Sequence, residues 1–187
     1  MRKKILSIIL TTTMVLGLIP GIPCVNQVKA ESSWKLVWSD EFNGDSLNTD
    51  VWTRETGGSG WGNNEIQNYI PGSKNGETCA QVSNGTLKII AKKVGNEVYS
   101  IRMNTVESWK YGYFKARLKL PAGKGTWPAF WMMPKNYTAW PDDGEIDIME
   151  EVGYDPNVIL STVHCKAYNH SIGTQKSGTI KVPTAQT

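Results

Sequence analysis

After residue 31 the sequence consists of short runs of strand-forming residues with almost no helical pattern, which limits it to a few β architectures. Clusters of Gly, Asn, Asp and Pro separate the runs and favour turns. Asn84-Gly85 suits a type I′ hairpin, and Gly95-Asn96 is a second turn signal. The pattern predicts an antiparallel sandwich or barrel. The predicted strands cover residues 34–38, 86–92, 97–104, 111–120, 128–133, 145–151, 158–165 and 179–182.

The first thirty residues differ in composition from the rest. They hold four basic residues and no acidic one, and residues 5–20 form an apolar run interrupted only by Ser and Thr. This pattern predicts a secretory signal peptide over residues 1–30, cleaved after Ala30, and one domain over residues 31–187. The alternative is a membrane anchor, but the apolar run is shorter than the roughly 20 residues that a span needs. We therefore expect a secreted protein with no membrane association after cleavage.

The charge of the remaining chain is close to neutral. The sequence has 20 Lys and Arg against 17 Asp and Glu, and removing the first thirty residues leaves 16 basic and 17 acidic side chains. This balance argues against a nucleic-acid partner. Cleavage would also leave two cysteines, Cys79 and Cys165, which could pair in an oxidising compartment.

The most informative segment is residues 144–153, with the sequence GEIDIMEEVG. In a strand, Glu145 and Asp147 share one face, because successive side chains alternate. Met149 and Glu150 then break the alternation. A β-bulge near Ile148 and Met149 would restore it, since one extra residue turns Glu150 to the side of Asp147.

Three carboxylates on one face cannot all stay ionised, so one must hold a proton near neutral pH. Glycoside hydrolysis requires one ionised and one protonated carboxylate beside the sugar bond. With the bulge, the two glutamates lie roughly 13 Å apart along the backbone, and their side chains can approach to about 5–6 Å. That separation is typical of a retaining mechanism. From these residues alone, a solvated strand face or a short helix remains an alternative.

Tryptophans support the hydrolase interpretation, because Trp127, Trp131 and Trp140 precede the acids and indole rings stack on sugars. Together, four segments resemble glycoside hydrolase family 16 in its endo-β-1,3-glucanase (laminarinase) branch. These segments are residues 34–44 (WKLVWSDEFNG), 60–69 (GWGNNEIQNY), 111–134 (YGYFKARLKLPAGKGTWPAFWMMP) and 144–153.

This resemblance implies an all-β fold, a β-jelly-roll sandwich of two curved antiparallel sheets that binds β-glucan along the concave sheet. It also implies a retaining double displacement on internal β-1,3 or mixed β-1,3/1,4 bonds. Glu145 matches the nucleophile and Glu150 the general acid/base. Asp147 would lie between them and help to set the charge state of the nucleophile.

The resemblance further implies a set of substrate-binding residues: Asn64, Glu65, Arg102, Trp127, Trp131 and His164. The family usually has Gly where this chain has Ile101. A structural calcium is also implied, with oxygens from Glu41 and the carbonyl of Gly85, in keeping with the preference of calcium for oxygen. We expect no cofactor for catalysis, and a monomer.

Family domains continue well past the strand that holds His164, so the resemblance implies that this chain is a C-terminally truncated fragment. One alternative function is a lectin-like jelly roll that binds β-glucan without cutting it. Retention of the three acids argues against it. The other is a metal-dependent hydrolase using His164, Cys165 and His170, which lack a recognised ligand spacing.

Overall fold

The computed structural model describes residues 34–187, and the predicted signal peptide lies outside the described residues. The chain divides into two units, Met1–Asp40 and Glu41–Thr187. In the first unit, the described residues 34–40 have no regular secondary structure, so the strand predicted at 34–38 is wrong. Alternation of side chains shows which way each one would face in a strand, and by itself it does not make a segment a strand. Within residues 34–187, no helix is long and apolar enough to cross a membrane.

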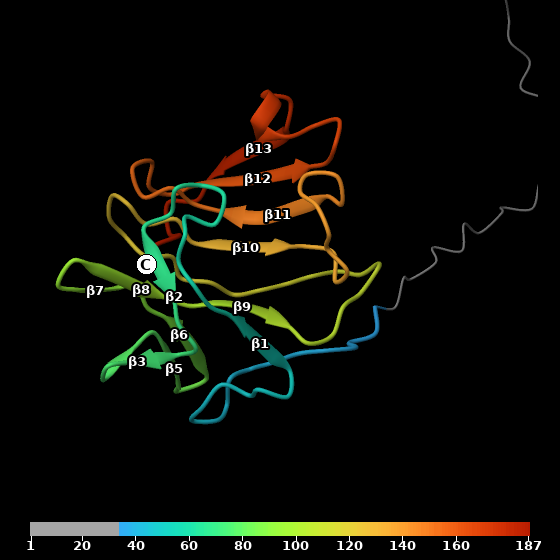
Figure 1. Ribbon diagram of the computed structural model, residues 1–187. Coiled ribbons are helices and arrows are strands. Elements are labelled where there is room, and N and C mark those ends of the chain that lie inside the picture. Colours follow the sequence, from blue (N-terminus) through green and yellow to red (C-terminus); the bar gives the residue numbers. More distant parts are fainter. Residues whose placement is uncertain (1–33) are drawn as a thin grey trace, which may run out of the picture. The chain divides into compact units, whose positions relative to one another are not determined.

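The second unit contains an antiparallel four-stranded sheet, the orange-to-red strands of Figure 1. Three of its strands lie within one residue, at each end, of the segments predicted from sequence. In spatial order the strands are β10 (Ala129–Met132), β11 (Glu145–Glu150), β12 (Val158–His164) and β13 (Lys176–Lys181).

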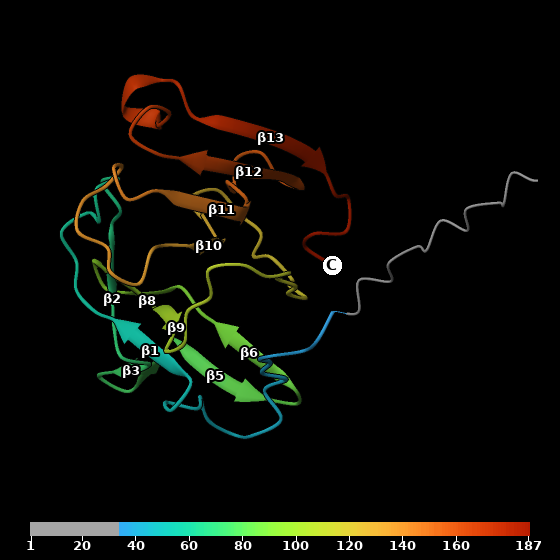
Figure 2. The same ribbon diagram turned by 90° about the vertical axis from the view of Figure 1, so that its right-hand side faces the viewer.

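The remaining strands form smaller sheets, and Figure 2 shows β1, β5, β6 and β9 in a layer apart from the four-stranded sheet. One pair is β1 (Trp52–Glu55) with β9 (Arg102–Thr105). A three-stranded sheet joins β2 (Gln67–Tyr69), β8 (Glu97–Ser100) and β7 (Lys92–Val94), with β2 parallel to β8. Two further pairs are β3 (Ser73–Lys74) with β4 (Glu77–Thr78), and β5 (Ala80–Ser83) with β6 (Thr86–Ile89).

The hairpin predicted at Asn84-Gly85 is confirmed. Both residues have positive φ, 54° and 67°, as a type I′ turn requires, and they join β5 to β6. Two predicted strands are each divided: residues 86–92 into β6 and β7, and residues 97–104 into β8 and β9. The second division falls at Ile101, which is 5% exposed, because β8 pairs with β2 and β7 whereas β9 pairs with β1.

The prediction of a strand at residues 111–120 is also wrong, although its alternation is regular. No residue of this described segment lies in a strand, and Leu120 donates its backbone N–H to the Ala185 carbonyl at 2.8 Å. A strand needs a continuous ladder, and alternation reports which way side chains face rather than whether a neighbour is present. Phe114, Leu118 and Leu120 nevertheless line an apolar cavity beneath the four-stranded sheet.

A small core lies between the shorter strands. Ile70, Cys79 and Tyr99 are buried together, with Val94 packed against them. Cys79 is fully buried in this core, whereas Cys165 follows β12 at the start of a loop. Both thiols are free, so the two cysteines do not form a disulfide in this structure.

Candidate active site

Strand β11 contains the predicted β-bulge. Against β12, Asp147 pairs with Thr162 and Glu150 pairs with Leu160, so three steps on β11 match two on its neighbour. Against β10, the same extra residue lies between the partners of Trp131 and Phe130. A bulge of this kind reverses the alternation for every residue that follows it. Glu145, Asp147 and Glu150 therefore project from one face, and we call them the carboxylate cluster.

The bulge residues have the complementary position. Ile148 and Met149 line the apolar cavity together with Phe130 and Ile159. The same strand thus supplies apolar contacts on one face and acids on the other. This division follows from the order of apolar and acidic residues in β11, because burial of apolar side chains away from water lowers the free energy.

The electrostatics of the carboxylate cluster favour protonation. Asp147 is 4% exposed, and burial, the Glu145 charge and a hydrogen bond to Glu145 raise its pKa to about 8. Burial also raises the pKa of Glu150, an effect opposed by a hydrogen bond from Trp127 and reinforced by the Glu145 charge. Near neutral pH, Asp147 therefore holds a proton. The cluster contains both protonated and ionisable carboxyl groups, as sequence reasoning required.

Two indoles hold the two glutamates. Trp127 donates its Nε1–H to Glu150 Oε1 at 2.8 Å, and Trp140 donates its Nε1–H to Glu145 Oε2 at 2.6 Å. The Trp127 contact involves a residue predicted for the site. The hydrogen bond from Trp140 to Glu145 was not predicted from the sequence. The position of Trp140, five residues before Glu145, could have indicated it.

His164 lies beside the carboxylate cluster from the neighbouring strand. It pairs in register with Glu145, and its Nε2 is 3.3 Å from Asp147 Oδ2. His164 is 7% exposed, and burial lowers its pKa, with the Glu145 charge opposing and His170 reinforcing the effect. The imidazole is therefore neutral at neutral pH and can hydrogen-bond with protonated Asp147.

Three of these side chains also have the geometry of a cation site. Within residues 34–187, the ligand atoms of Glu145, Asp147 and His164 lie within 4.8 Å of one another. This group does not include Cys165 or His170, so the ligand set considered for a metal-dependent hydrolase is not assembled.

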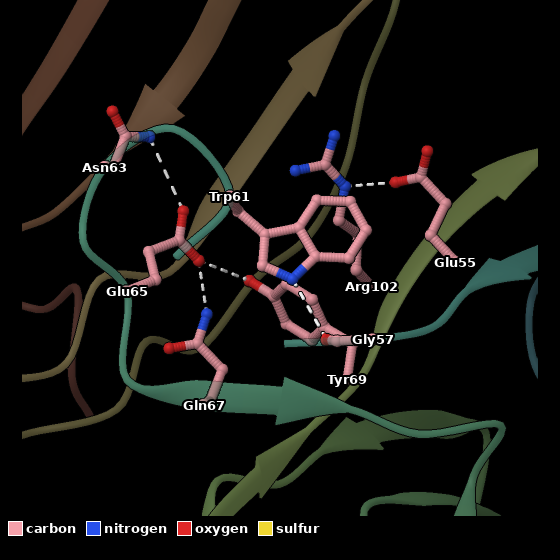
Figure 3. A network of polar contacts seen from close by, with 8 residues as sticks. All are labelled: Glu55, Gly57, Trp61, Asn63, Glu65, Gln67, Tyr69 and Arg102. Atoms are coloured by element: carbon pink, nitrogen blue, oxygen red, sulfur yellow. Dashed lines mark hydrogen bonds and ion pairs between the residues drawn. The ribbon is translucent and has the colours of Figure 1, made fainter. Parts of the chain in front are cut away.

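A second group of polar and aromatic side chains surrounds Arg102, and Figure 3 shows two of the predicted site residues in it, Glu65 and Arg102. The guanidinium lies between two indoles, 4.7 Å from the Trp61 ring centroid and 4.6 Å from that of Trp131. Arg102 Nε donates to Glu55, which fixes the plane of the group. Because Trp131 pairs with Asp147 across β10 and β11, this Arg102 stack adjoins the carboxylate cluster.

Glu65 belongs to the loop on the other side of Trp61. It accepts hydrogen bonds from Tyr69 Oη at 3.0 Å and from Gln67, as Figure 3 shows. Burial and the Glu65 charge raise the pKa of Tyr69 to about 12, so the phenol remains a donor. Asn64 precedes Glu65 with φ of 57° and is exposed. The structure therefore brings Glu65, Arg102 and Trp131 into one region, with Asn64 at its edge.

Of the two predicted calcium ligands, Gly85 lies in the turn between β5 and β6, and Glu41 lies in the segment before β1. A Cβ atom added at Gly85 would be 3.9 Å from both the Glu41 carbonyl oxygen and Asn43 Oδ1. Two oxygens of the segment 41–43 thus lie close to the Gly85 turn. An all-oxygen set of carbonyl and amide groups suits calcium, and Asn43 is a donor that sequence reasoning did not name.

The chain is similar to known glycoside hydrolases over most of its length. A family model described as the XgeA-like catalytic GH16 domain matches residues 65–186. A β-glucanase from Rhodothermus marinus is 44% identical over 188 residues, covering 94% of this chain and 65% of the relative. The X-ray structure of the laminarinase from Rhodothermus marinus superposes with a TM-score of 0.75 at 48% identity, covering 82% of this chain and 64% of that one.

A second structure contains a ligand. It is a non-specific endo-β-1,3(4)-glucanase with 1,3-β-D-cellobiosyl-glucose at its active site, at TM-score 0.75 and 39% identity, covering 83% of this chain and 65% of that one. The chain thus spans about two thirds of the length of these relatives, and its fold is the β-jelly roll of the laminarinases. Since the family model matches well over half of its residues, the chain belongs to glycoside hydrolase family 16.

Proposed function

We propose that this chain is an endo-β-glucanase that hydrolyses internal β-1,3 bonds, and mixed β-1,3/1,4 bonds, with retention of configuration. The observation that carries the proposal is the bulge in β11, which gives Glu145, Asp147 and Glu150 one common face. Similarity to a β-glucanase, and to an endo-β-1,3(4)-glucanase with 1,3-β-D-cellobiosyl-glucose at its active site, supports β-glucan as the substrate class.

In the first step, Glu150 gives its proton to the glycosidic oxygen while the Glu145 carboxylate attacks the anomeric carbon. The carbon–oxygen bond breaks, the leaving sugar departs with the proton, and a glycosyl ester on Glu145 remains. In the second step, Glu150 takes a proton from water as the water oxygen attacks the anomeric carbon and frees Glu145. Protonated Asp147 donates a hydrogen bond to Glu145 and stabilises its charge before the attack and again as the carboxylate leaves in the second step.

The raised pKa of Glu150 supports its role, because a general acid must hold its proton near the working pH. Trp127 and Trp140 each donate to one carboxylate, which fixes the direction of the two groups. The Arg102 stack would provide an aromatic wall for neighbouring sugar units, since sugar C–H faces stack on indoles.

The first experiment measures reducing ends released from laminarin by the wild-type chain and by Glu145→Ala. We expect release by the wild type and none by the variant. Glu107→Ala, a change of an exposed glutamate outside the site, is the matched control and should retain wild-type activity. Binding of laminarin by the wild type without any release would favour the lectin-like alternative.

Azide distinguishes the two glutamates when an aryl β-glucan oligosaccharide is the substrate. In Glu145→Ala, azide should attack in place of the nucleophile and give the α-glycosyl azide. In Glu150→Ala, azide should attack the glycosyl ester and give the β-glycosyl azide. The opposite configurations would reverse the two roles.

We also propose a structural calcium near Gly85. The convergence of the Glu41 carbonyl and Asn43 Oδ1 on this turn supports it. Glu41 and Gly85 come from separate segments, so a shared cation would join the start of the second unit to the β5–β6 hairpin. The calcium ion would stabilise the fold rather than take part in the reaction, since the Gly85 turn belongs to the smaller sheets and not to the sheet that contains β11.

A further inference from the structure

Three aromatic rings meet beside Glu145. Trp140, which donates to Glu145 Oε2, has the His170 ring tilted against it, with centroids 4.6 Å apart and planes at 31°. His164 meets His170 edge to face at 5.3 Å and lies 5.7 Å from Trp140. His170 is exposed. It meets the carboxylate cluster by way of two rings, Trp140, which donates to Glu145, and His164, which lies beside Asp147.

The loop that carries His170 is held in place by buried contacts. His170 begins the short 3₁₀ helix His170–Ile172, which follows Asn169. Asn169 is 3% exposed, and its Nδ2 donates to the carbonyls of Cys165 and Lys166 at 3.2 and 3.3 Å. Its backbone N–H donates to Thr174 Oγ1 at 3.2 Å. The position of His170 is thus set by a fixed turn rather than by a free side chain.

A second contact joins this loop to the segment that carries Trp140. Lys166 Nζ is 2.9 Å from Asp142 Oδ2, and Asp142 is two residues after Trp140. The ion pair is exposed and contributes little stability on its own. The ring contact and the ion pair therefore join the two loops at two points, at Trp140 and at Asp142.

We propose that His170 is a positioning residue, whose imidazole packs on Trp140 and keeps the indole N–H directed at Glu145 Oε2. This inference rests on the proposed role of Glu145 as nucleophile. An aromatic contact of this kind should favour the donating orientation of Trp140 by roughly threefold to tenfold. Its loss should lower the rate of the chemical step by the same factor, and leave substrate binding nearly unchanged.

The experiment compares kcat and KM on laminarin for His170→Ala, His170→Phe and Ile172→Ala. Ile172 lies on the same 3₁₀ helix and its side chain is 60% exposed to solvent, so it is the matched control. We expect kcat to fall threefold to tenfold in His170→Ala with KM within twofold. Phenylalanine should restore kcat to within twofold, and Ile172→Ala should match the wild type. A phenylalanine variant as slow as the alanine variant would overturn the proposal.

Trp140→Phe closes a double-mutant cycle, because it keeps an aromatic ring and removes the N–H donor. If His170 acts through that donor, His170→Ala should cause little further loss of kcat in the Trp140→Phe background. A loss equal to that seen in the wild-type background would overturn the proposal, since His170 would then act by another route.

An NMR measurement separates this inference from the proposed function. The indole N–H signal of Trp140 is assigned by its absence in Trp140→Phe, and should move upfield in His170→Ala as the hydrogen bond to Glu145 weakens. An unchanged signal would overturn the positioning role. If the wild-type chain releases no sugar but the Trp140 signal still moves upfield in His170→Ala, the proposed function is refuted and the positioning role stays intact.

Discussion

Replacement of Trp127 by phenylalanine tests how Glu150 keeps its pKa within reach of the working pH. Trp127 donates to Glu150 Oε1 at 2.8 Å, and this bond favours the ionised carboxylate and so lowers the Glu150 pKa. A hydrogen bond to a charged group contributes about 1.5–3 kcal/mol. Trp127 is 49% exposed, so water competes with the indole for the carboxylate. We therefore take about half of the lower limit, about 0.75 kcal/mol, as the contribution of this hydrogen bond. At about 1.4 kcal/mol per pKa unit, the Glu150 pKa should rise by about half a unit.

The sign of the effect on activity follows from the role of Glu150. A general acid must be protonated for the first step, so a higher pKa moves the alkaline limb of the kcat/KM profile upward by about half a pH unit. The profile is measured on laminarin between pH 4 and 10. Trp131→Phe is the control, because it removes an indole of the same region that lies against the Arg102 guanidinium. An alkaline limb that stays in place, or moves downward, in Trp127→Phe would refute this reasoning.

Three further predictions concern stability. The pKa of Asp147 is raised to about 8, above the value of about 4 for an unfolded aspartate. The stabilisation from this group is therefore complete below about pH 4 and is lost as the pH rises through about 8. Over this pH range the Tm of Asp147→Asn should fall less than the Tm of the wild type, and parallel curves would contradict the assignment. Arg102→Lys keeps the charge but loses the planar contact with Trp61 and Trp131, so urea denaturation should show a loss of about 1–2 kcal/mol, and an unchanged midpoint would argue against the Arg102 stack. Calcium should raise the Tm relative to EGTA, by less in Asn43→Ala; equal Tm values with and without calcium in the wild type would exclude the site near Gly85.

The bulge of β11 was predictable because it is recorded in the order of side chains. Met149 and Glu150 break a period-two alternation, and one extra residue is the smallest change that restores it. The turn at Asn84 was predictable for a similar reason, since its backbone requirement is local. Residues 111–120 alternate as regularly and form no strand, because a ladder depends on a partner far along the chain.

Several contacts of the site join segments that are far apart in the sequence, so they could not be predicted from local patterns. Trp140 and His170 are thirty residues apart and meet only because the loops before β11 and after β12 lie side by side. Glu55 pairs with Arg102 across β1 and β9 in the same way. Glu151 follows Glu150 directly, yet it is 1% exposed and bonds to Gln186 and Asn157 instead.

The order of residues by itself determined that Glu145, Asp147 and Glu150 share one face of a strand, since the direction of side chains along a strand is a local property. Only the tertiary structure decided which of these carboxyl groups holds a proton. Burial of Asp147, the N–H of Trp127 at Glu150 and the neutral ring of His164 all come from the packing of other strands and loops. A pKa depends on everything within a few ångströms, and that neighbourhood exists only once the chain has folded.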